Sequence, residues 1–351
     1  MRTSTKILFG FIAFSVMTSC KKENSIPANV NSQIEEIRSA PPGGNYWSER
    51  KFFPSWIDGA TGFSVNGKGY LVGGTVYGEY SDKVWEYDPT ANTWTEKSSI
   101  PFARPRSHVA VFVIDDKAYI VGGTGDRAFE GYDPIEETWE YTPLTNGWRQ
   151  RRNLNEPRSH AIGFSINGKG YIATGRTNSI LRNDLVEYDP IANSWSTKAP
   201  LVDFTAPDND LRRYSAVAVV INNKAYVGTG LGNSNIFRND WWQYNPLTNS
   251  WVRKGDFPGG ARYGAFAFSI GSIGYLGTGN RAGGFYNDLW SYNASSDSWI
   301  QRADMPGYGR TNAVAFVIGS YGYAGMGHLD YLRYAQKLYR YTRSTTGGLS
   351  Q

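Results

Sequence analysis

Residues 158–195, RSHAIGFSINGKGYIATGRTNSILRNDLVEYDPIANSW, decide the fold, because their pattern recurs along the whole chain. Tyr171 is followed four residues later by Gly175, and this spacing returns at intervals of about 50 residues. The tyrosines are Tyr70, Tyr119, Tyr171, Tyr226, Tyr275 and Tyr323, and the glycines are Gly74, Gly123, Gly175, Gly230, Gly279 and Gly327. The sequence therefore predicts one array of repeated units rather than several unrelated domains.

Each unit predicts four short antiparallel strands. Apolar runs such as 108–114 and 214–221 are rich in β-branched and aromatic residues and too short for helices, which indicates buried strands. A polar turn such as Asn167-Gly168 follows, with residues that tolerate the positive φ of tight hairpins. One four-stranded sheet cannot bury both of its faces, whereas several sheets packed radially can.

The double glycines Gly73-Gly74 and Gly122-Gly123, together with turns such as YDPIANSW, resemble kelch repeats over almost all of residues 45–342. Later units carry Thr-Gly or Met-Gly in place of the double glycine. The resemblance implies an all-β fold, a six-bladed kelch-type β-propeller with four antiparallel strands in each blade.

A second spacing, a tyrosine followed seven residues later by a tryptophan, recurs at the same repeat position in five of the six units. The pairs are Tyr87/Trp94, Tyr141/Trp148, Tyr188/Trp195, Tyr244/Trp251 and Tyr292/Trp299. The sixth unit has Tyr341 without a tryptophan, whereas Trp47 stands ahead of the first unit without a tyrosine partner. We expect Trp47 to lie on the outermost strand of the last blade, where it would close the ring and remove its exposed edges.

The first residues are typical of an export signal. Arg2 and Lys6 precede a short apolar core, and small residues lead up to Cys20, as in the lipobox of bacterial lipoproteins. We expect a signal peptide at 1–19, lipidation of Cys20, a flexible tether at 20–44, the propeller at 45–342 and a tail at 343–351. This places the protein in the cell envelope of a Gram-negative bacterium, on the outer membrane and held only by its lipid anchor. An ordinary cleaved signal with a chance cysteine is the alternative.

Composition excludes several functions. The net charge is +5 and no basic stripe is present, so nucleic acid is not an expected partner. Cys20 is the only cysteine, so no intrachain disulfide is possible. The copper site of galactose oxidase, another kelch-type enzyme, needs a cysteine crosslinked to a tyrosine, which disfavours that chemistry. We expect no cofactor, no metal and a monomeric protein.

The long, variable connections of all units are expected on one face, and binding usually resides in such loops. An arginine stands thirteen residues before the repeat tyrosine in five units, and we expect these arginines to surround the mouth of the central channel. They are Arg106, Arg158, Arg213, Arg262 and Arg310, and His108 and His160 follow two of them. These residues are candidate ligand-binding groups, since guanidinium binds carboxylates by paired hydrogen bonds. The alternative is that the arginines hydrogen-bond loop carbonyls of neighbouring blades, since kelch repeats often carry an arginine here, and that the histidines are solvated or hydrogen-bonded.

The same loops contain many aromatic residues, which offer flat apolar faces to sugars or to partner side chains. They are Trp56, Tyr77, Tyr80, Phe129, Phe204, Phe237, Phe285, Tyr286, Tyr308, Tyr331 and Tyr334. We expect about half of them to pack between blades instead.

Two functions follow from these features. One is a binding module for a glycan, peptide or protein at the loop face. The other is a sugar mutarotase or epimerase resembling the exported sialic-acid mutarotases, with Glu156 beside Arg158 as a candidate acid/base on the channel rim. A solvated loop carboxylate is the alternative for Glu156.

Overall fold

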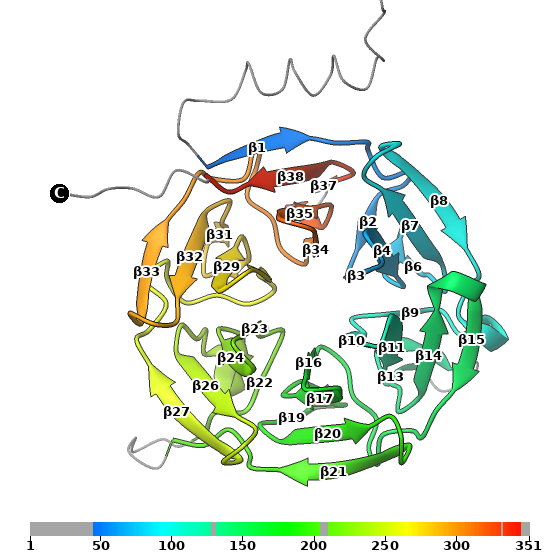
Figure 1. Ribbon diagram of the computed structural model, residues 1–351, viewed down its shortest axis with the longest axis horizontal. Helices are drawn as coiled ribbons and strands as arrows, with labels where there is room; N and C mark the ends of the chain where they lie inside the picture. Colours follow the sequence, from blue (N-terminus) through cyan, green and yellow to red (C-terminus); the bar gives the residue numbers. More distant parts are fainter. Residues whose placement is uncertain (1–44, 128–130, 204–209, 331–332, 345–351) are drawn as a thin grey trace, which may run out of the picture. The chain divides into compact units, whose positions relative to one another are not determined.

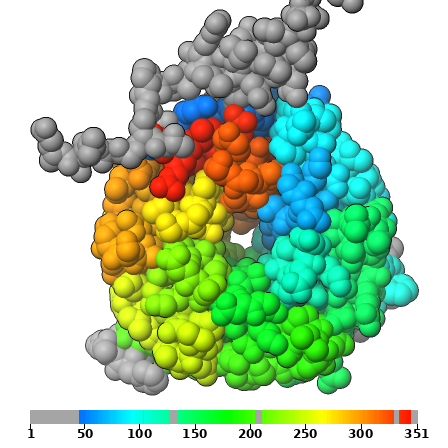
Figure 2. All heavy atoms as spheres, viewed as in Figure 1, coloured from blue at the N-terminus to red at the C-terminus, as the bar shows by residue number. Residues whose placement is uncertain are grey.

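The computed structural model describes residues 45–127, 131–203, 210–330 and 333–344. These residues contain six four-stranded antiparallel sheets, arranged as blades around a central channel (Figures 1 and 2). The all-β propeller predicted from the sequence is confirmed. The expected signal peptide, Cys20 and the tether lie outside the described residues and stay predictions. None of the helices in the described part of the chain is long and apolar enough to cross a bilayer.

The strands of a blade follow one another from the channel outward (Figure 1). From the innermost strand, the first three blades are β3 (Thr61–Val65), β4 (Lys68–Val72), β7 (Val84–Asp88) and β8 (Thr93–Lys97); β10 (Ala110–Ile114), β11 (Lys117–Val121), β14 (Thr138–Thr142) and β15 (Gly147–Gln150); and β16 (Ile162–Ile166), β17 (Lys169–Ala173), β20 (Leu185–Asp189) and β21 (Ser194–Lys198). The next three are β23 (Val217–Ile221), β24 (Lys224–Gly228), β26 (Trp241–Asn245) and β27 (Ser250–Lys254); β28 (Phe266–Ile270), β29 (Ile273–Gly277), β32 (Leu289–Asn293) and β33 (Ser298–Gln301); and β34 (Val314–Ile318), β35 (Tyr321–Gly325), β38 (Leu338–Thr342) and β1 (Tyr46–Glu49).

The variable connections carry a second tier of short strands, which we call the loop face. They are β2 (Ile57–Asp58), β5 (Thr75–Val76) and β6 (Glu79–Tyr80); β9 (Arg106–Ser107), β12 (Thr124–Arg127) and β13 (Gly131–Pro134); β18 (Arg176–Thr177) and β19 (Ile180–Leu181); β22 (Arg213–Tyr214) and β25 (Leu231–Gly232); β30 (Asn280–Arg281) and β31 (Gly284–Phe285); and β36 (His328–Asp330) and β37 (Arg333–Tyr334). Three 3-10 turns complete the described elements: η1 (Pro101–Ala103), η2 (Pro143–Thr145) and η3 (Asn233–Asn235).

The N-terminal strand closes the ring, as predicted from the missing tryptophan of the sixth unit. β1 pairs with β38, and Trp47 stands opposite Tyr341 in the register. The two rings lie 5.1 Å apart between centroids, the same distance as between Tyr87 and Trp94 in the first blade. The first and last described strands therefore share one sheet, in blue and red at the top of Figure 1.

The recurring YDPxxNxW turn has a hydrogen-bonding explanation. The Tyr188 hydroxyl donates to Asn193 Oδ1 at 2.6 Å, and Asn193 has a left-handed φ of 49°. The same Asn193 oxygen accepts the Arg152 backbone N–H, and Trp195 Nε1 donates to the Arg152 carbonyl at 2.8 Å. The motif thus fastens the outer strand of a blade to the connection that enters it.

Blades pack through a phenylalanine on an inner strand and a glycine on the next blade. A Cβ atom at Gly170 would stand 2.1 Å from Phe112 Cε2, and one at Gly69 would stand 2.2 Å from Phe316 Cε2. Only glycine fits against these rings in their present positions, which explains the glycine before the repeat tyrosine.

Candidate functional site

Six equivalent residues, one in each blade, lie just before the innermost strands. We call them the collar: Gly59, His108, His160, Ser215, Gly264 and Asn312. Every collar residue has a left-handed φ, between 50° and 63°. Backbone hydrogen bonds join neighbours in turn, from His108 N to the Gly59 carbonyl (2.7 Å) and onward to Asn312 N, which donates to the Gly264 carbonyl (2.7 Å). The backbone at the mouth of the channel is therefore held by its own hydrogen bonds, and its chemistry depends on the collar side chains.

The collar surrounds a cavity of about 220 Å³ at the centre of the ring (Figure 2). Beyond the collar, its walls are mostly small residues such as Ala161 and Ala216. Because two collar positions are glycine, His108, His160, Ser215 and Asn312 supply the collar side chains. The structure thus brings together both histidines that the sequence singled out.

His108 and His160 form a stacked pair. Their ring centroids are 3.8 Å apart and their planes differ by 15°. Each Nδ1 shares a hydrogen bond with the serine before it, Ser107 at 2.9 Å and Ser159 at 3.2 Å. Burial, together with the charge of Arg176, lowers the pKa of His108 to about 4. Burial and then His108 and Arg176 hold the pKa of His160 well below its usual range. Both imidazoles are neutral at pH 7.

Arg176 lies close enough to the collar for its charge to lower the pKa of both His108 and His160. It begins β18, directly after Gly175, and its guanidinium carbon lies 5.4 Å from the centre of the Tyr214 ring. Tyr214 in turn meets His160 edge to face at 5.6 Å. Among the residues that the structure describes, Arg176 has no carboxylate partner. A guanidinium without a carboxylate beside an aromatic face is suited to an anionic group.

An acidic group lies on the first-blade side of the mouth. Burial raises the pKa of the Asp58 carboxyl, and hydrogen bonding to Asn312 and the charge of His328 oppose this rise only in part. Asp58 Oδ1 and His328 Nε2 are both buried without a partner among the described residues. His328, the third of the three histidines in the chain, exchanges backbone hydrogen bonds with Thr311, the residue before the collar residue Asn312.

The structure corrects the expected position of the five repeat arginines, Arg106, Arg158, Arg213, Arg262 and Arg310. They are between 0% and 4% exposed, and none of them lines the central cavity. Each donates to the carbonyl sixteen residues later in its own blade, and four also pair with carboxylates. The carboxylates belong to Glu137, Asp184, Asp240 and Asp288. The expected ring of arginines around the channel mouth is therefore wrong, because the arginines are buried and most of their donors join each loop to its blade.

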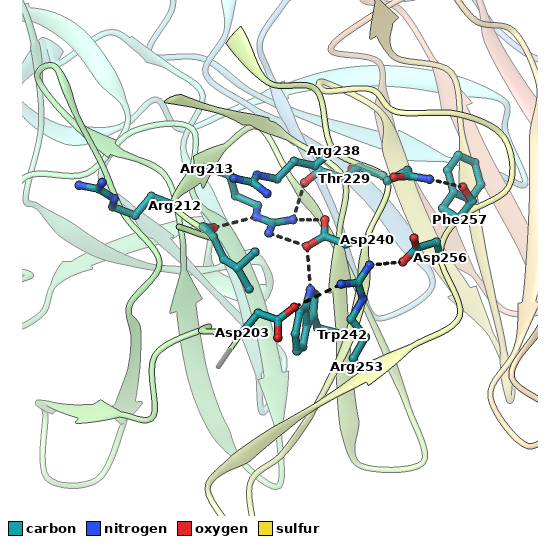
Figure 3. A network of polar contacts seen from close by, with 12 residues as sticks. Asp203, Arg212, Arg213, Thr229, Arg238, Asp240, Trp242, Arg253, Asp256 and Phe257 are labelled. Carbon is teal, nitrogen blue, oxygen red and sulfur yellow. Dashed lines mark hydrogen bonds and ion pairs between the residues drawn. The ribbon is translucent and has the colours of Figure 1, made fainter. Parts of the chain in front are cut away.

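Arg213 illustrates this arrangement (Figure 3). Its Nη2 donates to Asp240 Oδ2 at 2.7 Å, and Nη1 donates to the Thr229 carbonyl at 3.1 Å. Trp242 Nε1 donates to the same carboxylate oxygen at 2.7 Å. Burial raises the pKa of Asp240, but Arg213 outweighs it and holds the pKa below its usual value. The pair is a buried structural ion pair.

Glu156 also lies elsewhere than expected. It pairs with Arg182 and lines a separate cleft on the third blade, not the central cavity. It is exposed and therefore fits the solvated loop carboxylate better than a channel acid/base.

The loop aromatics divide into two groups. Trp56, Tyr77 and Tyr308 are 47%, 69% and 69% exposed, so they are available to a ligand. Tyr286 instead covers the guanidinium of Arg262, and Phe285 packs on His328. Three further candidates, Phe129, Phe204 and Tyr331, lie outside the described residues.

No group of histidine, cysteine, aspartate and glutamate among the described residues has a geometry that could hold a metal ion.

Comparisons with known proteins agree with this fold. A family model described as the kelch motif matches residues 59–101. Spermatocyte protein spe-26 of Caenorhabditis elegans is 27% identical over 54% of this chain and 32% of its own length. Kelch-like protein terF of Aspergillus terreus is 25% identical over 60% of this chain and 47% of its own length. The chain thus spans less than half the length of these relatives.

The solved structure of YjhT superimposes with a TM-score of 0.70 at 15% identity, covering 82% of this chain and 95% of that one. At this identity the likeness concerns the fold alone. The radial sheets define a β-propeller. The kelch motif and the kelch-like relatives specify its type, and the chain is a kelch-repeat β-propeller.

Sequence reasoning missed Arg176, Asp58 and His328. A signal was present for two of them: Arg176 and His328 directly follow the repeat glycines Gly175 and Gly327. That position is threonine in the first two units and a different residue in each of the other four, and such variation is expected of a binding residue on a repeated scaffold.

Proposed function

We propose that this protein is an exported, lipid-anchored binding module that holds a carboxylate-bearing glycan, peptide or protein segment at the mouth of its channel. The observation that carries the proposal is Arg176, a cation of the mouth without a carboxylate partner among the described residues. The carboxylate would lie against Arg176, and the exposed Trp56 and Tyr77, whose rings are 5.6 Å apart, would contact the rest of the ligand. The bonded state of the repeat arginines supports a scaffold role for them and leaves Arg176 as the recognition group.

Binding is tested with arrays of acidic glycans and of peptides. Wild type is expected to retain acidic members, and Arg176→Gln is expected to lose them. Arg281→Gln is the matched control, because Arg281 lies on the equivalent hairpin of the fifth blade. Arrays that stay blank, or retention that survives Arg176→Gln, would contradict the proposal.

The expected lipid anchor has its own test. Cys20→Ser should abolish incorporation of labelled palmitate and move the protein from the membrane fraction to the soluble fraction. A soluble wild-type protein would favour the ordinary cleaved signal instead.

The mutarotase is the second candidate. Two neutral imidazoles stand within the electrostatic reach of Arg176, as an acid/base beside a carboxylate clamp requires. Anomer exchange of freshly dissolved N-acetylneuraminic acid, followed by NMR, should then accelerate in proportion to protein concentration and depend on His160. Exchange at the spontaneous rate across all protein concentrations removes this candidate and leaves the binding module.

A further inference from the structure

A second cavity lies on the third blade, separate from the channel. It is a cleft of about 290 Å³ bordered by the connection that enters this blade, by β19 and by the outer strands β20 and β21. None of its lining residues lines the central cavity. The β18–β19 hairpin borders both sites, since Arg176 belongs to the mouth whereas Ile180, Leu181 and the following Arg182 line the cleft.

Two guanidinium groups in this cleft are neutralised but not fully bonded. Arg158 pairs with Asp184 at 2.8 Å, and Arg182 pairs with Glu156. The Nε atoms of Arg158 and Arg182 are nevertheless buried without a hydrogen-bond partner among the described residues. Arg158 is 4% exposed, so its free donor lies in the protein wall of the cleft. Unsatisfied buried donors are rare and call for an explanation.

Three of the four equivalent arginines in the other blades bond their Nε internally. Arg106, Arg213 and Arg262 each donate from Nε to the carbonyl two residues earlier, at 2.9–3.2 Å. Arg158 does not donate to the carbonyl of Glu156. Three blades thus satisfy this donor internally, whereas Arg158 in the blade with the cleft and Arg310 in the sixth blade leave it without a partner among the described residues. Of these two arginines, only Arg158 lines the cleft.

The remaining walls combine an aromatic ring with polar groups. Trp195 and Val186 are apolar contacts, and Asn155 and Thr197 are exposed polar ones. The carboxylates of Glu156 and Asp184 supply acceptors and repel an entering anion, while the two Nε–H groups need acceptors. A hydroxyl group both donates and accepts, and the apolar face of a sugar ring can pack on an indole.

We propose that this cleft binds one neutral pyranose ring, with its hydroxyls between the two Nε–H donors and the two carboxylates and with one face against Trp195. The site does not depend on the proposed carboxylate site at the mouth, because each guanidinium here already has its own counter-charge.

The test is saturation-transfer NMR with the methyl pyranosides of glucose, galactose, mannose and N-acetylglucosamine. At least one is expected to receive saturation from the wild type. Arg182→Met should weaken the binding of that pyranoside by about tenfold, because the variant lacks one hydrogen bond to the sugar. Asn155→Ala provides a second variant that changes only an exposed side chain. Thermal melting confirms that both variants are folded.

Arg176→Gln and Arg281→Met are the controls, and both should bind the pyranoside as the wild type does. Loss in Arg176→Gln would place the sugar at the mouth and overturn the proposal. The proposal is also wrong if none of the four pyranosides binds, if Arg182→Met binds normally, or if benzoate competes with the sugar, since that would make the cleft an anion site.

Discussion

His108 and His160 stack face to face at 3.8 Å although they belong to neighbouring blades and stand 52 positions apart in the chain. His108 also covers Gly59, where a Cβ atom would stand 2.6 Å from its Cε1. Three blades therefore meet through one imidazole pair. In the described part of the chain no carboxylate favours the charged form of either ring, so protonation of the pair opposes the folded state.

This relationship predicts a loss of stability in mild acid. The pKa of His108 is lowered to about 4 in the folded state, against an ordinary value near 6.5. Above pH 6.5 the His108 imidazole is neutral in both the folded and the unfolded protein, so it does not lower the free energy of unfolding. As the pH falls from about 6.5 towards 4, the unfolded chain binds the proton first, and the free energy of unfolding should fall by up to about 1.4 kcal/mol per pH unit.

His108→Asn separates this effect from general acid denaturation. Asparagine tolerates a left-handed φ, and Asn312 already occupies a collar position with φ of 53°. Urea unfolding at pH 7 and pH 5 should give a smaller difference for the variant than for the wild type. An equal difference in both proteins would mean that His108 does not titrate in this range.

Breaking the buried pair of Arg213 and Asp240 should lower the free energy of unfolding much more than breaking an ion pair on the surface. Arg213→Met leaves Asp240, 7% exposed, without its counter-charge and should lower the free energy of unfolding by about 3–5 kcal/mol. Lys83→Met breaks the pair with Glu96, whose side chains are 48% and 44% exposed, and should cost less than about 1 kcal/mol. Similar losses for both variants, measured by denaturant unfolding, would contradict the structural role of the arginine.

The architectural residues could be predicted because every blade needs them. Tyr188, Asn193 and Trp195 recur since each blade must fasten its outer turn, and a repeated need leaves a repeated pattern in the sequence. The absence of a sixth tryptophan was informative for the same reason, and it located Trp47 correctly.

The residues of the two proposed sites could not be predicted in the same way. Conspicuous repetition drew attention to Arg106 and its equivalents, but repetition here marks a structural need, and those arginines are buried. Arg176 and Asp58 have no equivalents of their kind in the other blades, and only the three-dimensional ring brings them beside His108 and His160. The stretch 158–195 contributes to two sites, with Arg158 in the cleft and His160 at the mouth, a division that the sequence does not indicate.

Packing between blades predicts the effect of adding one methyl group. Gly170→Ala would place a Cβ 2.1 Å from the Phe112 ring, so the ring must move, at a cost of about 1–3 kcal/mol in the free energy of unfolding. The second and fourth blades carry Ala118 and Ala225 at this position, so we expect the variant to fold. Phe112→Leu combined with Gly170→Ala should cost less than the sum of the two single changes.

Gly255→Ala is the matched control for that series. Its nearest contact would be 3.6 Å, an ordinary van der Waals distance, and its φ is not in the left-handed region. It should change the free energy of unfolding by less than about 0.5 kcal/mol. If Gly255→Ala and Gly170→Ala melt alike, contact with Phe112 does not explain the glycine.

Closure of the ring predicts that a five-residue deletion at one end affects the whole propeller. Removing Tyr46–Arg50 takes β1 from the last blade, together with the Trp47–Tyr341 contact and the hydrogen bond from Trp47 Nε1 to the Ala303 carbonyl at 2.9 Å. The last blade then ends in an exposed edge at β38, and the pairing between the first and last described strands is lost. We expect the cooperative thermal transition to disappear. Deletion of residues 21–25 in the expected tether removes the same number of residues and should leave the transition in place, whereas unchanged melting of the Tyr46–Arg50 deletion would show that β1 is not needed to close the ring.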